Sequence, residues 1–200
     1  MRILVACEHS GTVRDAFRAK GHEALSCDLL TSDVPGPHYT GDVFDIVGDG
    51  WDMMIAFPPC TYLCVSGIHW NNRGRGWDKT DGAARFFAAL YHAPIAKIAI
   101  ENPVGVMSTR LRKPDQIVHP YQFGDDASKR TCLWLRGLPT LCPTAFVAPR
   151  LVEWNGKTVH RWSNQCDSNQ NRLGPSDDRW KLRSRTYPGI AAAMADQWGG

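Results

Sequence analysis

Four short segments carry side chains that could do chemistry, and each follows a run of apolar residues. These segments are Glu8–Gly11, Asp28, Pro58–Cys60 and Glu101–Pro103. Carboxylates can bind hydroxyl groups or move protons, and a thiolate can add to an electron-poor carbon. Ligands of an open parallel sheet bind outside the carboxyl ends of its strands. We therefore expect the four segments to form one site.

The segments between these residues predict an alternation of strands and helices. Apolar runs predict strands at 2–6, 22–27, 51–57, 97–100 and 131–135, and helical spacing predicts helices at 12–20, 81–91 and 190–198. This alternation is typical of an α/β fold with a doubly wound, mostly parallel, Rossmann-like sheet. The glycine pattern G-x-G-x-x-G is absent, so a dinucleotide is not the favoured ligand.

The composition describes a chain that can bury a core. Of the 200 residues, 43% are hydrophobic and 22% are charged, which excludes a disordered chain. The formal net charge of +3 is uneven, since residues 1–100 carry −2 and residues 101–200 carry +5. A basic second half fits a polyanionic partner. Seven dispersed cysteines, and no apolar run of signal-peptide or membrane-span length, predict a cytoplasmic protein with free thiols.

Two segments show no regular pattern. Residues 66–79 predict a long loop in which Asn71–Arg75, flanked by Trp70 and Trp77, could close over a substrate. Residues 137–185 predict a loop-rich insert or a reduced recognition region, and their cysteines and His160 match no zinc-ligand spacing, so no metal is expected. We predict one domain over 1–200, with a catalytic core at 1–136 and a C-terminal helix at 186–200 that returns to the core.

Two of the turns resemble the signatures of the cytosine-5 DNA methyltransferases. Phe57-Pro58-Pro59-Cys60 is similar to the nucleophile turn of that family, and Ile100-Glu101-Asn102-Pro103 is similar to its Glu-Asn-Val turn, in the same order. Asp42 resembles the residue of a Gly-Asp turn that meets the cofactor adenine, and Arg130 resembles an arginine of a further signature segment. The segment 137–185 is too short for the family's target-recognition domain.

The resemblance implies a cofactor, a mechanism and a set of site residues. The cofactor would be S-adenosylmethionine, bound by Glu8, Ser10, Gly11, Asp28, Asp42 and Pro58. Cys60 would add to C6 of cytosine, which makes C5 nucleophilic, while Glu101 bonds N3 and Arg130 holds O2. Substrate contacts would come from Pro59, Asn102, Arg73, Arg75, Arg110 and Arg112. Cys64, four residues after the nucleophile, is expected to be a bystander.

Three functions remain open at this point. The favoured one is methylation of cytosine in DNA, with the base flipped out of the stack. The same chemistry on a free cytidine nucleotide would explain the short chain. A catalytically degenerate methyltransferase fold that binds nucleic acid or a partner without turnover is the third hypothesis.

Overall fold

A seven-stranded sheet forms the centre of the molecule, in the order β3-β2-β1-β4-β5-β7-β6. The computed structural model describes residues 1–176 and 179–200. The strands are β1 (Arg2–Ala6), β2 (Glu23–Asp28), β3 (His38–Thr40), β4 (Met53–Ala56), β5 (Lys97–Pro103), β6 (Gln116–Val118) and β7 (Thr131–Arg136). Strands β1 to β5 pair in parallel, and β7 is antiparallel to both of its neighbours, β5 and β6.

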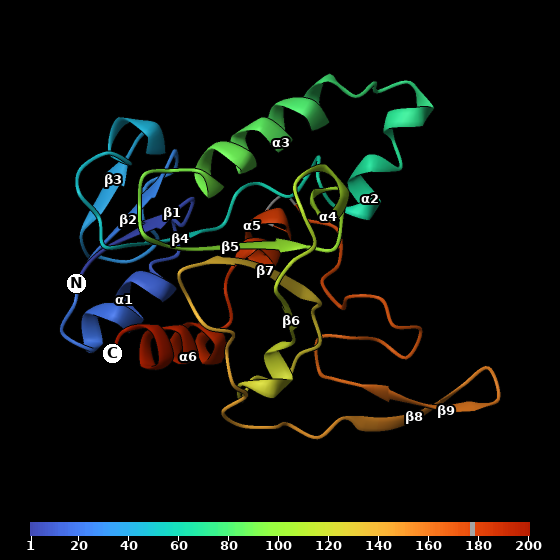
Figure 1. Cartoon of the computed structure of the whole chain (residues 1–200). Coiled ribbons are helices and arrows are strands. Elements are labelled where there is room, and N and C mark those ends of the chain that lie inside the picture. The colour runs from blue at the N-terminus through green and yellow to red at the C-terminus, as the bar shows by residue number, and fades with distance from the viewer. Residues whose placement is uncertain (177–178) are drawn as a thin grey trace.

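Helices cover both faces of this sheet (Figure 1). They are α1 (Thr12–Ala19), α2 (Val65–Ile68), α3 (Asp78–Tyr91), α4 (Met107–Arg110), α5 (Arg179–Ser184) and α6 (Pro188–Trp198), with short 3-10 turns η1 (Val43–Asp45), η2 (Asn71–Arg73) and η3 (Pro120–Gln122). Helices α1 and α6 pack together on one face, and α3 lies on the other. The predicted α/β fold with a mostly parallel sheet is therefore confirmed.

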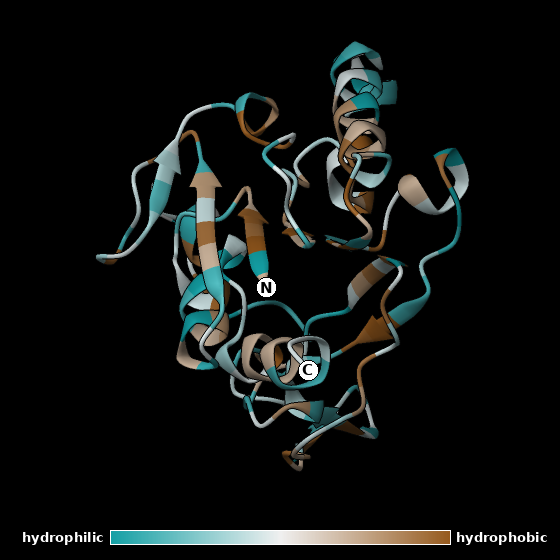
Figure 2. Ribbon diagram, turned by 60° about the vertical axis from the view of Figure 1, so that its left-hand side comes forward, coloured by the Kyte–Doolittle hydropathy of each residue, from teal (hydrophilic) through white to brown (hydrophobic). Residues whose placement is uncertain are grey.

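The sheet is buried on both faces, which explains the continuous apolar runs of its strands. In β1, Ile3 and Val5 join the core beneath α1 and α6, whereas Leu4 and Ala6 join the core beneath α3. Figure 2 shows the same pattern, with brown hydrophobic segments in the strands and teal segments in outer loops. The helix Pro188–Trp198 closes the first core, so it packs against the sheet.

A two-stranded hairpin, β8 (Arg150–Trp154) and β9 (Lys157–Arg161), extends away from the sheet (Figure 1). Its turn residues Asn155 and Gly156 have φ values of 51° and 72°. Two successive positive φ angles are typical of the two-residue turns that match strand twist, and Asn-Gly is the sequence that favours them. The expectation of a loop-rich insert therefore missed a regular element.

Other differences from the sequence expectations are local. The predicted loop 66–79 contains α2 and η2, and the proline-rich segment before residue 42 contains β3. Strand β6 has three residues and was not predicted. In the part of the chain that the structure describes, no helix has the length and apolar character needed to cross a membrane.

Candidate active site at the carboxyl ends of the strands

The turn after β4 places Cys60 beside the end of β5. The Pro58 carbonyl accepts a 2.8 Å hydrogen bond from the side-chain amide of Asn102, which is 1% exposed. This bond joins the two turns that the sequence singled out. The Cys60 carbonyl accepts hydrogen bonds from the backbone N–H groups of Leu63 and Cys64, both 3.0 Å long, so the turn is a single tight coil.

Close backbone packing at Gly105 fixes this coil against the loop after β5. The N–H of Val106 donates to the Leu63 carbonyl over 2.9 Å, and Cys64 forms an isolated bridge with Gly105. A Cβ atom on Gly105 would lie 2.0 Å from the Leu63 carbonyl oxygen. Only glycine therefore permits this approach.

The thiols of Cys60 and Cys64 are hydrogen-bonded to each other. That bond, together with the Ser66 hydroxyl and the Gly67 N–H, lowers the pKa of Cys64 to about 5. The pKa of Cys60 is raised, first by the bond to Cys64 and then by burial and the Glu101 charge. The pair therefore releases one proton readily and the second reluctantly, as expected for coupled groups. Cys64 was expected to be a bystander, and it lies close enough to Cys60 for each thiol to shift the pKa of the other.

Glu101 and Lys129 complete this end of the site. The Glu101 side chain is 13% exposed, and its Oε1 lies 3.7 Å from the Lys129 ammonium. Antiparallel pairing of β5 with β7 produces this contact, because Asn102 pairs with Cys132 and Pro103 with Thr131. Arg130, the predicted partner of the substrate, is exposed. Burial lowers the pKa of His119, and the positive charge of Arg130 lowers it further. Lys129 was missed as a site residue, although it adjoins Arg130 in sequence.

The turn after β1 is shaped by Glu8. Its buried carboxylate accepts hydrogen bonds from the N–H groups of Val13 (2.7 Å) and Arg14 (3.3 Å) and from the Ser10 hydroxyl (3.1 Å). Gly11, with φ of 74°, lets the chain enter α1 beside these bonds. Burial raises the pKa of Glu8, and the hydrogen bonds oppose that rise. Glu8 therefore caps α1, in addition to any role toward a ligand.

Acidic groups gather at the ends of β1 and β2. Asp28 and Asp42 both act on the Cys27 thiol, whose pKa rises to about 11 because of burial and these charges. Asp28 accepts a 2.9 Å bond from the Leu30 N–H, and Asp42 caps η1 by accepting from Phe44 over 3.0 Å. Cys7, at the end of β1, has a left-handed φ of 58°. Such backbone strain in a residue other than glycine clusters at functional sites.

His9 and Asp33 were not singled out by the sequence. The His9 ring is within 3.9 Å of Asp28 and 3.8 Å of Asp33. Asp33 in turn pairs with Lys181 (2.7 Å) and Arg185 (2.9 Å), so it holds α5 and the residue after it near this edge of the sheet. No sequence spacing links residues 33 and 181, and only the fold brings them together.

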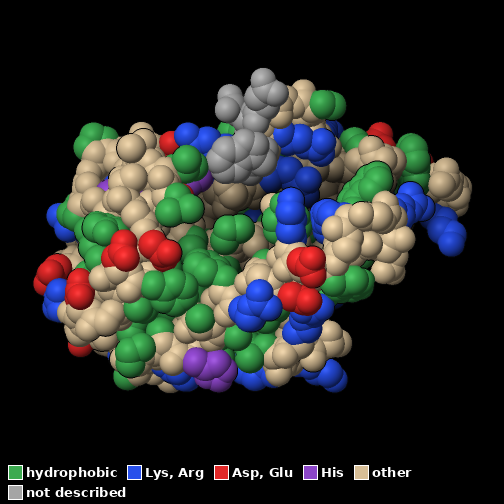
Figure 3. Space-filling model, turned by 90° about the horizontal axis from the view of Figure 1, so that it is seen from above, with side chains coloured by type: hydrophobic (Ala, Val, Ile, Leu, Met, Phe, Trp, Pro, Cys, Tyr) green, Lys and Arg blue, Asp and Glu red, His purple; other side chains and the backbone are tan. Residues whose placement is uncertain are grey.

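The arginines predicted to contact the substrate differ in the hydrogen bonds and ion pairs that they make within the protein. Arg112 bonds Asp115 (2.5 Å), the Tyr91 hydroxyl (2.9 Å) and the Leu135 carbonyl (2.9 Å), so it secures the sheet edge. Arg75 donates to the Asn71 side chain and the Gly67 carbonyl. Arg110 pairs with Asp81. Figure 3 shows Lys and Arg side chains over the middle and right of this face, with Asp and Glu side chains among them as well as at the left.

Comparison with known proteins gives the fold a name. The sequence matches no protein-family model and no curated protein sequence. Among solved structures, an Entamoeba histolytica methyltransferase is 13% identical, with 74% of this chain and 58% of that chain covered at a TM-score of 0.50. The chain has a methyltransferase fold. A structure provisionally described as a DNA modification methyltransferase of an E. coli prophage is also 13% identical, covering 68% of this chain and 46% of that chain at 0.45.

This methyltransferase fold accounts for the strand order and for the position of the site. The chain spans about half the length of the solved structures that it matches. The site residues lie at the strand ends where an open α/β sheet binds its ligands.

Proposed function

We propose that the chain transfers a methyl group from S-adenosylmethionine to C5 of cytosine in DNA, with Cys60 as the nucleophile. The observation that carries this proposal is the environment of Glu101. Its Oε1 is buried and has no hydrogen-bond partner among the described residues, although the Lys129 ammonium is 3.7 Å away. A buried acceptor without a donor is costly, and the N4 amino group of a cytosine would supply the donor.

The thiol pair gives Cys60 a route to its reactive form. Cys60 must lose its proton before its sulfur bonds to C6 of cytosine, and the neighbouring Cys64 thiolate is the group that would accept that proton, against the raised pKa of Cys60. The electron pair of the C5–C6 bond then resides at C5, which would bond to the methyl group as the bond from that group to the sulfonium sulfur breaks, with S-adenosylhomocysteine as the leaving group. A base removes the C5 proton, and the returning electron pair breaks the sulfur–carbon bond and frees Cys60. Hydrogen bonding at N3 by Glu101 favours the first addition.

The residues at the ends of β1 and β2 fit the methyl donor. Carboxylates at Asp28 and Asp42 suit ribose hydroxyls and the adenine amine, and Leu29 (77% exposed) and Phe44 (43% exposed) offer apolar cover for a purine. S-adenosylmethionine supplies an electrophilic methyl group on a sulfonium. Ser10, Gly11 and Pro58 are the further residues that we assign to its binding.

Methyl transfer with labelled cofactor tests this function. The substrates are duplex DNA, single-stranded DNA and deoxycytidine monophosphate at matched cytosine concentration, and the product base is identified after digestion. We expect 5-methylcytosine in DNA, and Glu101→Gln should lower the rate by about 100-fold or more, the usual effect of losing an acid–base group. Glu153→Gln, at an exposed hairpin position, should leave it unchanged. Labelling of the mononucleotide above DNA, or of a base other than cytosine, would contradict the proposal.

A further inference from the structure

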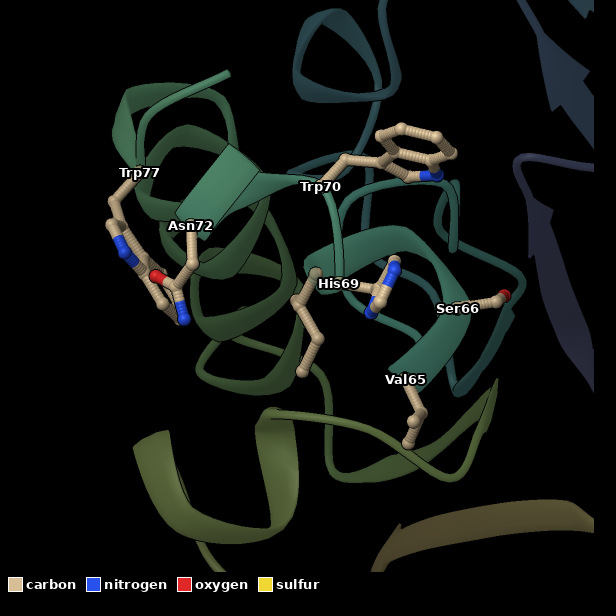
Figure 4. Close-up of a pocket in the computed structure, with 7 residues that line it drawn as sticks. Val65, Ser66, His69, Trp70, Asn72 and Trp77 are labelled. Carbon is tan, nitrogen blue, oxygen red and sulfur yellow. The ribbon is translucent and has the colours of Figure 1, made fainter. Parts of the chain in front are cut away.

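An aromatic hollow lies next to the nucleophile turn. It has a volume of about 650 Å³ and is lined by Val65, Ser66, Ile68, His69, Trp70, Asn72 and Trp77. Figure 4 shows Trp77 and Asn72 on one side of the hollow, and Ser66, His69 and Val65 on the side of α2. Apart from Ser66, whose hydroxyl contacts Cys64, the mechanism described above uses none of these residues.

Two of the large side chains of this aromatic hollow are exposed in a way that folding alone does not require. Trp70 is 55% exposed and Trp77 is 40% exposed. The backbone that carries them is nevertheless tied down, because the buried Asn71 amide donates to the Thr80 hydroxyl (2.8 Å), which donates to the Tyr62 carbonyl (3.0 Å). The hollow is therefore a fixed platform, which suits a flat ligand.

Positive charge surrounds the platform. The Arg73 guanidinium lies 6.0 Å from the Trp70 ring, and the Arg110 guanidinium lies 5.4 Å from the Trp77 ring. Across residues 65–80, three basic residues stand against one acidic residue, Asp78. Aromatic rings beside cations bind a ligand that has both a flat face and a negative charge. An unpaired nucleotide in a single strand is such a ligand.

The aromatic hollow also has a direct connection to Cys60. The Ser66 hydroxyl, which lines it, is 3.3 Å from the Cys64 sulfur, and Cys64 bonds the Cys60 thiol. The hollow therefore begins on the segment that directly follows the nucleophile turn, so a strand that places a cytosine at Cys60 can place a neighbouring base in the hollow. Paired bases in a duplex keep their faces stacked, so the hollow accepts only a base that has left the stack.

We propose that the aromatic hollow binds an unpaired base adjacent to the reacting cytosine, and that single-stranded DNA is the form of substrate the chain takes. This inference rests on the proposed function for the identity of the reacting base. The stacking site itself does not require catalysis.

Binding of a labelled oligothymidylate of about twelve nucleotides, a length within the site sizes of single-strand proteins, tests the inference without cytosine chemistry. Fluorescence anisotropy is compared for the wild type, Trp77→Ala, Trp77→Phe and Trp154→Ala. Trp154, on the distant hairpin, is 41% exposed and is a matched control for Trp77. We expect Trp77→Ala to weaken binding about tenfold, within the range for one lost base–aromatic stack, while Trp77→Phe retains most of the affinity and Trp154→Ala changes little.

Equal affinities of Trp77→Ala and Trp154→Ala would overturn the inference, as would equal binding of the oligothymidylate and its duplex with oligoadenylate. A thermal unfolding midpoint equal to that of the wild type establishes that a variant is folded. A failure of the proposed function would be distinguishable from this result. No 5-methylcytosine would form, but oligothymidylate binding would still depend on Trp77.

Discussion

Replacing Gly105 by alanine should displace the nucleophile turn while leaving the cofactor residues in place. The added Cβ would lie 2.0 Å from the Leu63 carbonyl oxygen, 2.8 Å from the Leu63 carbonyl carbon and 2.9 Å from the Cys64 Cα. All three are backbone atoms, so no side-chain rotation can relieve the contact. Ordinary contact begins at 3.4 Å, so the Leu63 carbonyl must move by about 1.4 Å.

Two consequences of this displacement can be measured. Overpacking of a buried position typically costs about 1–3 kcal/mol, which should lower the thermal unfolding midpoint. A shift of about 1 Å in a reacting group can lower the rate about 100-fold, so methyl transfer should fall by that factor. Binding of S-adenosylhomocysteine, measured by calorimetry, should change less than the rate, because all of its predicted residues except Pro58 lie after β1, β2 and β3.

Gly82→Ala is the matched control. It lies within α3, where an added Cβ meets only the Arg85 guanidinium at 4.0 Å. Alanine is favoured over glycine inside a helix by about 0.5–1 kcal/mol, so this variant should be slightly more stable and equally active. Wild-type stability and rate in Gly105→Ala would refute the reasoning that this glycine positions the turn.

Three further predictions follow from the contacts of the site. Cys64 should react with iodoacetamide faster than Cys60 at pH 7, with a rate that falls as pH drops through about 5, as mapped by mass spectrometry; faster labelling of Cys60 would contradict the thiol pairing. Hydrogen bonding to Lys181 lowers the pKa of Asp33, so its stabilisation is present above the unfolded pKa and lost as pH falls through the folded one. The unfolding midpoints of wild type and Asp33→Asn should therefore differ at pH 6 and converge near pH 3, and a constant difference would count against the ion pair. Asn102→Ala should cost about 1–3 kcal/mol in urea unfolding, because it leaves a buried carbonyl of the nucleophile turn without its donor, and a neutral result would argue against that bond.

The strands and long helices could be predicted because burial on both faces imposes a pattern on the sequence. The runs at 2–6 and 131–135 are apolar after their first residues, Arg2 and Thr131, and the structure has strands at Arg2–Ala6 and Thr131–Arg136. Strand β6 was not predicted because it has three residues, of which only Val118 is buried. The hairpin escaped because its flanking residues are exposed, although Asn155-Gly156 was a readable signal.

The part of the candidate site that lies at the carboxyl ends of the parallel strands could be predicted from the sequence. Parallel strands bring their carboxyl ends to one edge, so the meeting of the Cys60 and Glu101 turns follows from topology. The contact between Glu101 and Lys129 depends on the antiparallel direction of β7, which apolar runs do not indicate. The contact between Cys60 and Cys64 depends on the tight turn that follows Pro58 and Pro59 and packs against Gly105.

Covalent trapping of Cys60 tests the central claim most directly. Single-stranded DNA that contains 5-fluorocytosine is incubated with the protein and S-adenosylmethionine, and the adduct is located by peptide mass spectrometry. Fluorine cannot leave C5 as a proton does, so elimination is blocked and the sulfur–carbon bond persists. We predict a methylated adduct on the peptide that contains Cys60, absent in Cys60→Ala and retained in Cys142→Ala, which removes another exposed cysteine. Methyl transfer to cytosine in Cys60→Ala, or an adduct on Cys64, would contradict the account.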